Sequence, residues 1–184
     1  MFSWLQPTLL LVSVPGVALA QPSETDIPYS GSATFIIGSE TLRLEGQRVL
    51  KADGTVLVSE IYAPPVWDNN HLCVVDSGGG LGRLRCWDAH MEAVTLATGG
   101  FPTRLALGGT MVAWVASPHT LPQVFVGPVN GTGPNKALTN VDLLYIPGQA
   151  PEGFVPPPLG QSLRFEGDQL RWDSPEGPKA VQWR

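Results

Sequence analysis

Residues 105–114 read LALGGTMVAW, and this stretch, with two similar ones elsewhere in the chain, decides the fold class. The similar stretches are LRLEGQRVLK at residues 42–51 and LRFEGDQLRW at residues 163–172. In all three, Leu stands first, an apolar residue third, Gly fifth and an apolar residue eighth. Apolar residues spaced by two on either side of a glycine are typical of a β-hairpin with Gly in its turn. We therefore expect an all-β chain built from antiparallel hairpin repeats.

The composition agrees with a β-protein. The 184 residues include 21 Gly and 18 Pro, and charged residues make up only 15%, below the roughly 25% usual in soluble domains. That profile argues against a helical bundle, while 43% hydrophobic residues and a net charge of −5 argue against disorder. The 11 basic residues are scattered along the chain, so we expect no nucleic-acid partner.

The first residues have the features of an export signal. Residues 1–20, MFSWLQPTLLLVSVPGVALA, carry no charged side chain, have an apolar stretch over 9–14 and end in Ala18-Leu19-Ala20. Small residues at this spacing are typical of a signal-peptidase site, although such signals usually also contain Lys or Arg near the start. The apolar stretch is shorter than a spanning helix needs, and no second one follows. We expect cleavage after Ala20 and a secreted or periplasmic mature protein.

The rest of the chain divides by composition. We expect a polar leader over 21–32, a β-hairpin repeat domain over 33–145, a Pro- and Gly-rich arm over 146–160 and a C-terminal two-stranded β-hairpin over 161–184, packed on the same domain. Short strands are predicted at 33–37, 41–44, 49–51, 55–62, 104–107, 110–116, 123–126 and 135–138. Asp53-Gly54 predicts a tight turn. Residues 87–98 favour a strand over a helix, because Val94 and Leu96 alternate and β-branched residues are frequent.

Cys73 and Cys86 predict a disulfide, because an exported chain folds in an oxidising compartment. Free buried thiols are the alternative. If Cys73 stands opposite Cys86 in a hairpin, Val75 faces Leu84 and residues 78–81 form the loop. Leu72 and Trp87 then share the other face. A disulfide that closes such a short loop stabilises the folded state by on the order of 3 kcal/mol. The bridge therefore cross-links one hairpin and does not link domains.

A longer stretch adds a resemblance. Residues 99–139, GGFPTRLALGGTMVAWVASPHTLPQVFVGPVNGTGPNKALT, resemble a blade of the periplasmic Tol-system propeller and of the propeller domain of prolyl oligopeptidases. The matching elements are a Gly turn at 108–109, an apolar strand over 111–117, Gln-Val-Phe-Val at 123–126, a Gly turn at 130–131 and a closing Leu-Thr at 138–139. Residues 64–98 resemble a second, more divergent blade, so the match covers residues 64–139.

The resemblance implies a small or partial β-propeller. A blade takes roughly 40–45 residues, so the mature chain has room for about four at most. A β-sandwich of similar hairpins is the alternative fold. The peptidase activity of the oligopeptidases is not implied, because their Gly-x-Ser-x-Gly elbow is absent from this sequence.

Two short motifs resemble catalytic loops. Residues 74–78, VVDSG, match the apolar-apolar-Asp-Ser-Gly pattern of aspartic proteases, but such enzymes need two carboxylates and the chain holds one copy. Residues 76–79 are also similar to the nucleophile loop of trypsin-like proteases, although His71, His90 and His119 lie in no suitable context. We therefore assign no catalytic residue.

Two further patterns concern metal binding and glycosylation. Asp68, His71, Asp88 and His90 flank the disulfide hairpin and contain some of the ligand types that Zn²⁺ uses, but nothing completes a tetrahedral set. We therefore expect no metal and no cofactor. Asn130-Gly131-Thr132 fits a glycosylation acceptor if the source is a eukaryote, and otherwise a simple turn.

The most economical function is binding without catalysis. We expect a binding or scaffold module for a protein or polymer, in the periplasm or outside the cell. One alternative is a small secreted hydrolase in which acidic residues such as Asp68, Asp76 and Asp88 meet only in the fold. Another is a remnant of a larger propeller protein. Tryptophans near the strand ends, at 67, 87, 114, 172 and 183, are expected in the core, with an exposed carbohydrate or peptide platform as the alternative.

Overall fold

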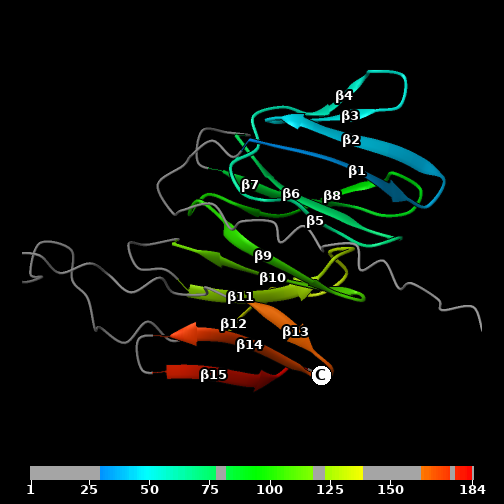
Figure 1. Ribbon diagram of the computed structural model, residues 1–184. Helices are drawn as coiled ribbons and strands as arrows, with labels where there is room; N and C mark the ends of the chain where they lie inside the picture. Colours follow the sequence, from blue (N-terminus) through cyan, green and yellow to red (C-terminus); the bar gives the residue numbers. More distant parts are fainter. Residues whose placement is uncertain (1–29, 78–81, 118–122, 139–162, 175–176, 184) are drawn as a thin grey trace, which may run out of the picture.

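The computed structural model describes residues 30–77, 82–117, 123–138, 163–174 and 177–183. These residues form strands, turns and bends arranged in four antiparallel sheets (Figure 1). The predicted signal peptide at 1–20 and the predicted arm at 146–160 lie outside the described residues. Within the described part of the chain, no helix is long and apolar enough to cross a membrane.

The strands follow one another along the chain, sheet by sheet. Sheet 1 contains β1 (Gly31–Ile37), β2 (Glu40–Gly46), β3 (Arg48–Lys51) and β4 (Val56–Val58). Sheet 2 contains β5 (Val66–Trp67), β6 (Leu72–Asp76), β7 (Arg83–Trp87) and β8 (Ala93–Thr98). Sheet 3 contains β9 (Thr103–Gly108), β10 (Met111–Ala116), β11 (Gln123–Pro128) and β12 (Lys136–Ala137). Sheet 4 contains β13 (Arg164–Glu166), β14 (Gln169–Ser174) and β15 (Gly177–Gln182).

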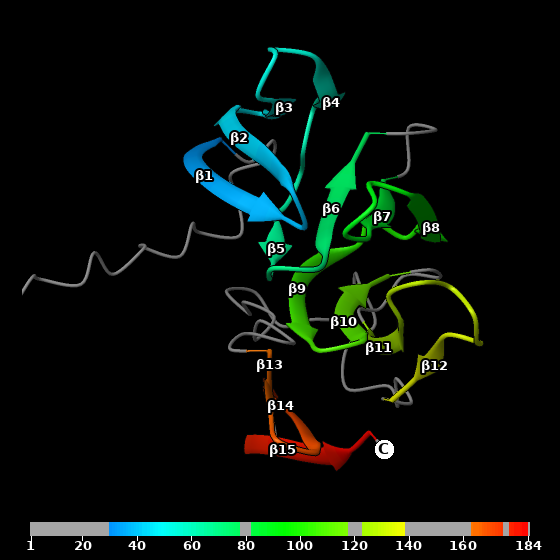
Figure 2. The same ribbon diagram turned by 90° about the vertical axis from the view of Figure 1, so that its right-hand side faces the viewer.

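The sheets stack in an open array. Within each sheet the strands pair in sequence order, and the first strands β5, β9 and β13 of successive sheets contact one another. Sheet 1 lies at the top of Figure 1 and sheet 4 at the bottom, and Figure 2 shows β5, β9 and β13 aligned on one side. Consecutive four-stranded meanders stacked in this way are typical of propeller blades. The predicted all-β, partial propeller-like fold is confirmed, and the described residues form four sheets rather than the two of a sandwich.

The glycine of the sequence repeat opens a two-residue turn. Gly46, Gly109 and Gly167 have φ of 62°, 60° and 59°, and the residue after each has a negative φ. Glycine with positive φ at the first of two central positions is typical of the type II′ hairpin turn. The apolar third and eighth positions of the repeat face each other across the hairpin, as Leu44 and Val49, Leu107 and Val112, and Phe165 and Leu170. The repeat is therefore a structural one.

Three apolar clusters fill the spaces between successive sheets, which is why each sheet needs its neighbour. Sheets 1 and 2 share Phe35, Leu42 and Leu72; sheets 2 and 3 share Val75, Leu84 and Trp114; sheets 3 and 4 share Val124, Leu170 and Trp172. Trp87, Trp114 and Trp172 are buried in these clusters, as predicted. Trp67 is more exposed and stacks on Phe35 with ring centroids 4.7 Å apart, so β1 and β5 also meet.

Three predictions about where strands begin or end, or how many there are, are corrected. The strand expected over 55–62 ends at Val58, because Glu60 has φ of 53° and Ile61 pairs with sheet 2 instead. The C-terminal unit has three strands rather than two, because β14 turns back once more to pair with β15. β1 begins at Gly31, inside the predicted leader. The segment 87–98 contains the strand β8 rather than a helix, which confirms that prediction.

Candidate functional site

The disulfide hairpin forms the centre of sheet 2. Cys73 is paired with Cys86 and Val75 with Leu84, and the two cysteines form a disulfide. These four residues face sheet 3, while Leu72 and Trp87 face sheet 1. The register and the bridge are as predicted, and the predicted loop at 78–81 lies outside the described residues. Every residue of β6 is buried, so this hairpin is rigid framework for what lies at its ends.

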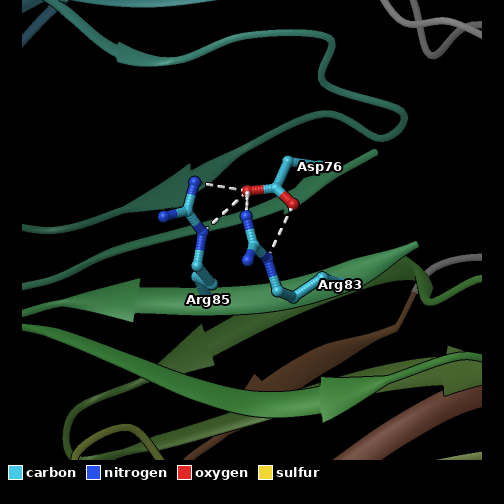
Figure 3. Close-up of polar contacts among 3 residues, drawn as sticks. All are labelled: Asp76, Arg83 and Arg85. Atoms are coloured by element: carbon cyan, nitrogen blue, oxygen red, sulfur yellow. Dashed lines mark hydrogen bonds and ion pairs between the residues drawn. The ribbon is translucent and has the colours of Figure 1, made fainter. Parts of the chain in front are cut away.

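Asp76 ends β6 as a buried carboxylate held between two arginines of the next strand (Figure 3). Arg83 Nε donates to Asp76 Oδ1 over 3.0 Å and Arg83 Nη2 to Oδ2 over 3.2 Å. Arg85 Nε donates to Oδ2 over 2.7 Å, and its Nη2 forms an ion pair with the same oxygen. The guanidinium of Arg85 also lies over the ring of Trp87, 4.7 Å from its centroid. Both arginines rise from one face of β7 because they are two residues apart.

The contacts among Asp76, Arg83 and Arg85, here called the triad, bear on whether the protease-like motifs are catalytic. An aspartic protease needs a carboxylate that shares a proton with a second carboxylate, whereas the Asp76 carboxylate is shared by two cations that are permanently charged. Ser77 points to the other face of the sheet, into a cavity whose described lining contains no histidine. The described geometry around Asp76 is that of a structural ion pair, and within the described part of the chain neither motif has catalytic partners beside it.

Two chain crossovers meet the end of sheet 2 next to the triad. The crossover from sheet 1 brings Ile61 beside Asp76, and Tyr62 N–H donates to the Val75 carbonyl over 2.9 Å. The crossover to sheet 3 brings Gly99, whose N–H donates to the Gly82 carbonyl over 2.9 Å. Both crossovers are thus fixed by backbone hydrogen bonds to the disulfide hairpin.

A cavity of about 40 Å³ lies between these crossovers. Since a water molecule needs roughly 10–15 Å³ of such space, the cavity has room for a few waters or one small side-chain end. Its lining consists of Tyr62, Val75, Ser77, Gly82, Phe101, Pro102 and Thr103. The lining combines apolar groups with three hydroxyls, which suits binding of a small apolar group with hydrogen bonds at the margin.

Phe101 projects from this wall into solvent, with 56% of its surface exposed. Gly99, Gly100 and Phe101 all have positive φ, at 81°, 69° and 45°. Glycine adopts this region freely, but a bulky residue there is an outlier that costs on the order of 1–2 kcal/mol. Strain of this kind is retained mainly where surrounding structure imposes it, and it clusters at ligand clamps and active sites. Phe101 is therefore held out by a strained backbone rather than left exposed by chance.

The predicted metal residues lie at the opposite end of sheet 2. Asp68 Oδ1 accepts hydrogen bonds from the backbone N–H groups of Asn70 and His71, both at 2.7 Å. Asp88 Oδ1 accepts from the N–H groups of His90 and Glu92, and the bond from Glu92 is the main cause that lowers the pKa of the Asp88 carboxyl. Both aspartates shape turns. Among the described residues, no three His, Cys, Asp or Glu side chains group as metal ligands.

Asp76 does not meet the other two acidic residues of the hydrolase alternative. Asp68 precedes β6 and Asp88 follows β7, whereas Asp76 closes the far end of the hairpin. Five strand residues span roughly 16 Å, which is too far for two carboxylates to act on one bond. A site that brings Asp68, Asp76 and Asp88 together is therefore contradicted. The Asn130 side chain accepts hydrogen bonds from the N–H and hydroxyl of Thr132 in an exposed turn, as the turn interpretation expects.

Sequence reasoning missed Phe101. Its signal was present in Gly99-Gly100-Phe101-Pro102, where two glycines before an aromatic residue permit a left-handed turn. The exposure of the ring depends on where the two crossovers lie, and this could not be read from the local residues.

No protein-family model matches the chain, and no curated protein matches it. Among solved structures, TolB from Acinetobacter baumannii is similar to it, with a TM-score of 0.47 and 12% sequence identity. The similarity covers 81% of this chain and 37% of the TolB chain, so this chain spans just over a third of that protein's length. The similarity is partial.

Proposed function

We propose that this protein is a non-enzymatic binding module that recognises a protein or polymer in the periplasm or outside the cell. The observation that carries the proposal is the exposed Phe101 ring at the wall of the cavity, presented by a strained left-handed turn. Aromatic side chains bury a large apolar area and are enriched at the centres of protein interfaces. The rigid disulfide hairpin beneath supports the site, and preorganisation of this kind lowers the entropic cost of binding.

A photo-crosslinking experiment tests the site. A benzophenone amino acid replaces Phe101 in one version of the protein and Ile36 in the other, and both are produced in cells of the source organism. Ile36 is the matched control, because it is a large apolar residue with 57% exposure on sheet 1. We expect a discrete adduct from position 101 and none from position 36. Equal labelling at both positions, or none at 101, would contradict the proposal.

The strained backbone supplies a second readout. Phe101→Ala removes the ring but keeps a side chain at positive φ, whereas Phe101→Gly removes the ring and the strain. We expect Phe101→Gly to be more stable than Phe101→Ala by about 1 kcal/mol in urea unfolding. Both should fail to compete with the wild-type protein for the crosslinked partner. A Gly variant that is less stable than the Ala variant would show that the backbone there is not strained.

The compartment is tested separately. Mass spectrometry of the protein from the cell envelope, without reducing agent, should show a chain that begins at Gln21 and carries the Cys73–Cys86 disulfide. A chain that keeps residues 1–20, or one found only in the cytoplasm, would contradict export.

A further inference from the structure

We propose that Asn130 is a site of spontaneous modification, at which its side-chain amide is lost and isoaspartate forms, and that the folded turn slows this reaction until the turn opens. Glycine has no Cβ, so its backbone nitrogen approaches the side chain before it without steric hindrance. Asn130-Gly131 is the single Asn-Gly pair of the sequence; the other asparagines, each followed by a larger residue, are Asn69, Asn70, Asn135 and Asn140. The inference goes beyond the proposed function and does not depend on it.

The reaction needs only water. The backbone nitrogen of Gly131 attacks Cγ of Asn130, a new N–C bond closes a five-membered succinimide, and the side-chain amide leaves as ammonia with the proton from that nitrogen. Water then adds to one of the two succinimide carbonyls and opens the ring. Opening at the backbone carbonyl gives isoaspartate, in which the main chain runs through Cγ, and opening at the side-chain carbonyl gives aspartate. No group is oxidised or reduced.

The turn is open to water, yet hydrogen bonds hold both reacting groups. Asn130, Gly131 and Thr132 are all exposed. Asn130 Oδ1 accepts hydrogen bonds from the Thr132 N–H over 3.1 Å and from the Thr132 hydroxyl over 2.8 Å. The Gly131 N–H, which belongs to the attacking nitrogen, donates to the Pro128 carbonyl over 3.0 Å. Exposure therefore brings water to the site without freeing the nitrogen.

The backbone of this turn keeps the nitrogen away from Cγ. The hydrogen bond from Gly131 to Pro128 closes a four-residue turn, and neither central residue, Val129 or Asn130, has a positive φ. These features are typical of a type I turn, in which ψ of the third residue is near 0°. A nearly planar succinimide instead requires the Gly131 nitrogen and the Asn130 Cβ to be eclipsed about the Cα–C bond. Ring closure thus rotates ψ of Asn130 and breaks the bond to Pro128.

Packing against sheet 2 opposes the same rotation. A Cβ added to Gly131 would lie 2.6 Å from Val94 Cγ1, so the turn lies close against β8. Farther along the loop, Asn135 Nδ2 donates to the Leu96 carbonyl over 2.6 Å, where β8 departs from regular pairing with β7. The reaction therefore depends on local opening of the loop from β8, in the way that amide exchange depends on local unfolding.

The two products fit the turn differently. Isoaspartate adds one CH₂ to the main chain before Gly131, and this displaces the glycine from its close contact with Val94. Aspartate keeps the main chain and the oxygen that accepts from Thr132. Both add a negative charge to a chain whose net charge is −5. Only isoaspartate should therefore weaken the contact between this loop and sheet 2.

The experiment incubates the mature protein at mildly alkaline pH, folded or in urea, with its disulfide intact. Mass spectrometry of the digests, with fragmentation that separates isoaspartate from aspartate, follows Asn130 in time. We expect conversion in both samples. It should be at least about tenfold faster in urea, because the hydrogen bonds of the turn no longer oppose ring closure.

Variants of Thr132 separate the turn from the Asn-Gly chemistry. Thr132→Val removes the hydroxyl that holds Oδ1 and should raise the rate in the folded protein by about fivefold, the factor that corresponds to one net hydrogen bond. Thr132→Ser is the matched control, because it keeps the hydroxyl, and should react at the wild-type rate. In urea all three proteins should react at closely similar rates.

The isolated products supply a readout of the contact with sheet 2. The isoaspartate form, separated by chromatography, should unfold at a lower urea concentration than the unmodified protein, and the amides of β8 should exchange faster in it. Asn130→Asp represents the other product and should leave the urea midpoint unchanged. An isoaspartate form as stable as the unmodified protein would contradict the role of Gly131 against Val94.

Several results would overturn the inference. Equal rates in folded and unfolded protein, or a Thr132→Val variant that reacts at the wild-type rate when folded, would show that the turn does not slow the reaction. Conversion at Asn135 as fast as at Asn130, or none at Asn130 in urea, would remove the assigned site. A glycan on Asn130 in protein from the source organism would do the same. The crosslinking at position 101 is unaffected by these results and tests the proposed function alone.

Discussion

Sheets 2 and 4 carry the same set of charges, a carboxylate between two arginines, in opposite surroundings. In sheet 2, Asp76 is 2% exposed and sits between Arg83 and Arg85. In sheet 4, the Glu166 side chain is 43% exposed and sits between Arg164 and Arg171 at 2.6 and 2.9 Å. The contact distances are similar. The difference in burial shows that the same arrangement of charges is part of the interior in sheet 2 and part of a solvated surface in sheet 4.

The position of each sheet in the array explains the difference. Sheet 2 is covered on both faces, by the cluster shared with sheet 1 and by the cluster shared with sheet 3. Sheet 4 lies at one end of the described stack (Figure 1) and shares an apolar cluster with sheet 3. Its outward face carries the exposed triad, in the way that the terminal units of stacked repeat proteins carry polar outer faces.

The largest expected effect is on the disulfide of sheet 2. Replacing Cys73 and Cys86 by Ala together should lower the free energy of unfolding by about 3 kcal/mol, because the bridge closes a short loop in the unfolded chain. Urea unfolding measures the loss. Hydrogen exchange should then show the amides of β6 and β7 opening as readily as those of β14, which would remove the difference between the two sheets. A loss below about 1 kcal/mol would mean that burial alone makes sheet 2 rigid.

The two triads give the next effect. Asp76→Asn should lower the free energy of unfolding by about 2 kcal/mol, because it leaves two partly buried guanidiniums without their shared carboxylate. Since both guanidiniums are partly exposed, this loss is smaller than the roughly 3–5 kcal/mol expected for a fully buried pair. Glu166→Gln is the matched control in sheet 4 and should leave the unfolding midpoint unchanged, since its pairs are solvated. Equal losses in the two variants would show that burial does not distinguish the triads.

The repeat turns should behave alike in spite of the different sheets. At both Gly109 and Gly167 a Cβ would meet nothing within 4 Å, so only the backbone conformation opposes a side chain. Gly109→Ala and Gly167→Ala should each lower the free energy of unfolding by about 1 kcal/mol. The Asn variants should lower it less, because Asn tolerates positive φ better than Ala. Thermal unfolding measures both. A cost at Gly167 alone would mean that the two turns are not equivalent.

The smallest expected effect is on the pKa of Glu166 and on stability at low pH. The hydrogen bond from Arg164 holds the pKa of Glu166 below its ordinary value of 4.5. A carboxyl with a lowered folded pKa contributes stability above its unfolded pKa, and this contribution is lost as the pH falls through the folded pKa. An NMR titration should therefore find Glu166 ionised below pH 4.5, and Arg164→Gln should raise its pKa toward the ordinary value. High salt should do the same, because exposed charges are screened. A Glu166 pKa at or above 4.5 in the wild-type protein would contradict the ion pair.

Much of the fold followed from local residues. The Gly-centred repeat located three of the hairpin turns, and the alternation around Cys73 and Cys86 gave the correct register and the correct face for each side chain. These succeeded because a strand alternates with a period of two and a two-residue turn needs a particular backbone conformation. The strand expected over 55–62 failed because Ile61 pairs with Asp76 of another sheet, a long-range contact that no local pattern encodes.

The candidate site was harder to predict than the fold. Asp76 drew attention through a protease-like motif, yet Arg83 and Arg85 make it structural, and their convergence depends on the hairpin register. Phe101 attracted no attention, because exposure of an aromatic residue is decided by what does not pack over it.

The sequence by itself determined the all-β class, the hairpin turns, the disulfide and the strand faces, because glycine conformation, cysteine pairing and side-chain alternation act over a few neighbouring residues. Only the tertiary structure decided that four sheets stack in an open array, that one arginine-carboxylate triad is buried while the other is solvated, and that Phe101 projects beside a cavity. Each of these depends on which sheets lie next to one another, and burial between sheets is a property of their packing rather than of any one strand.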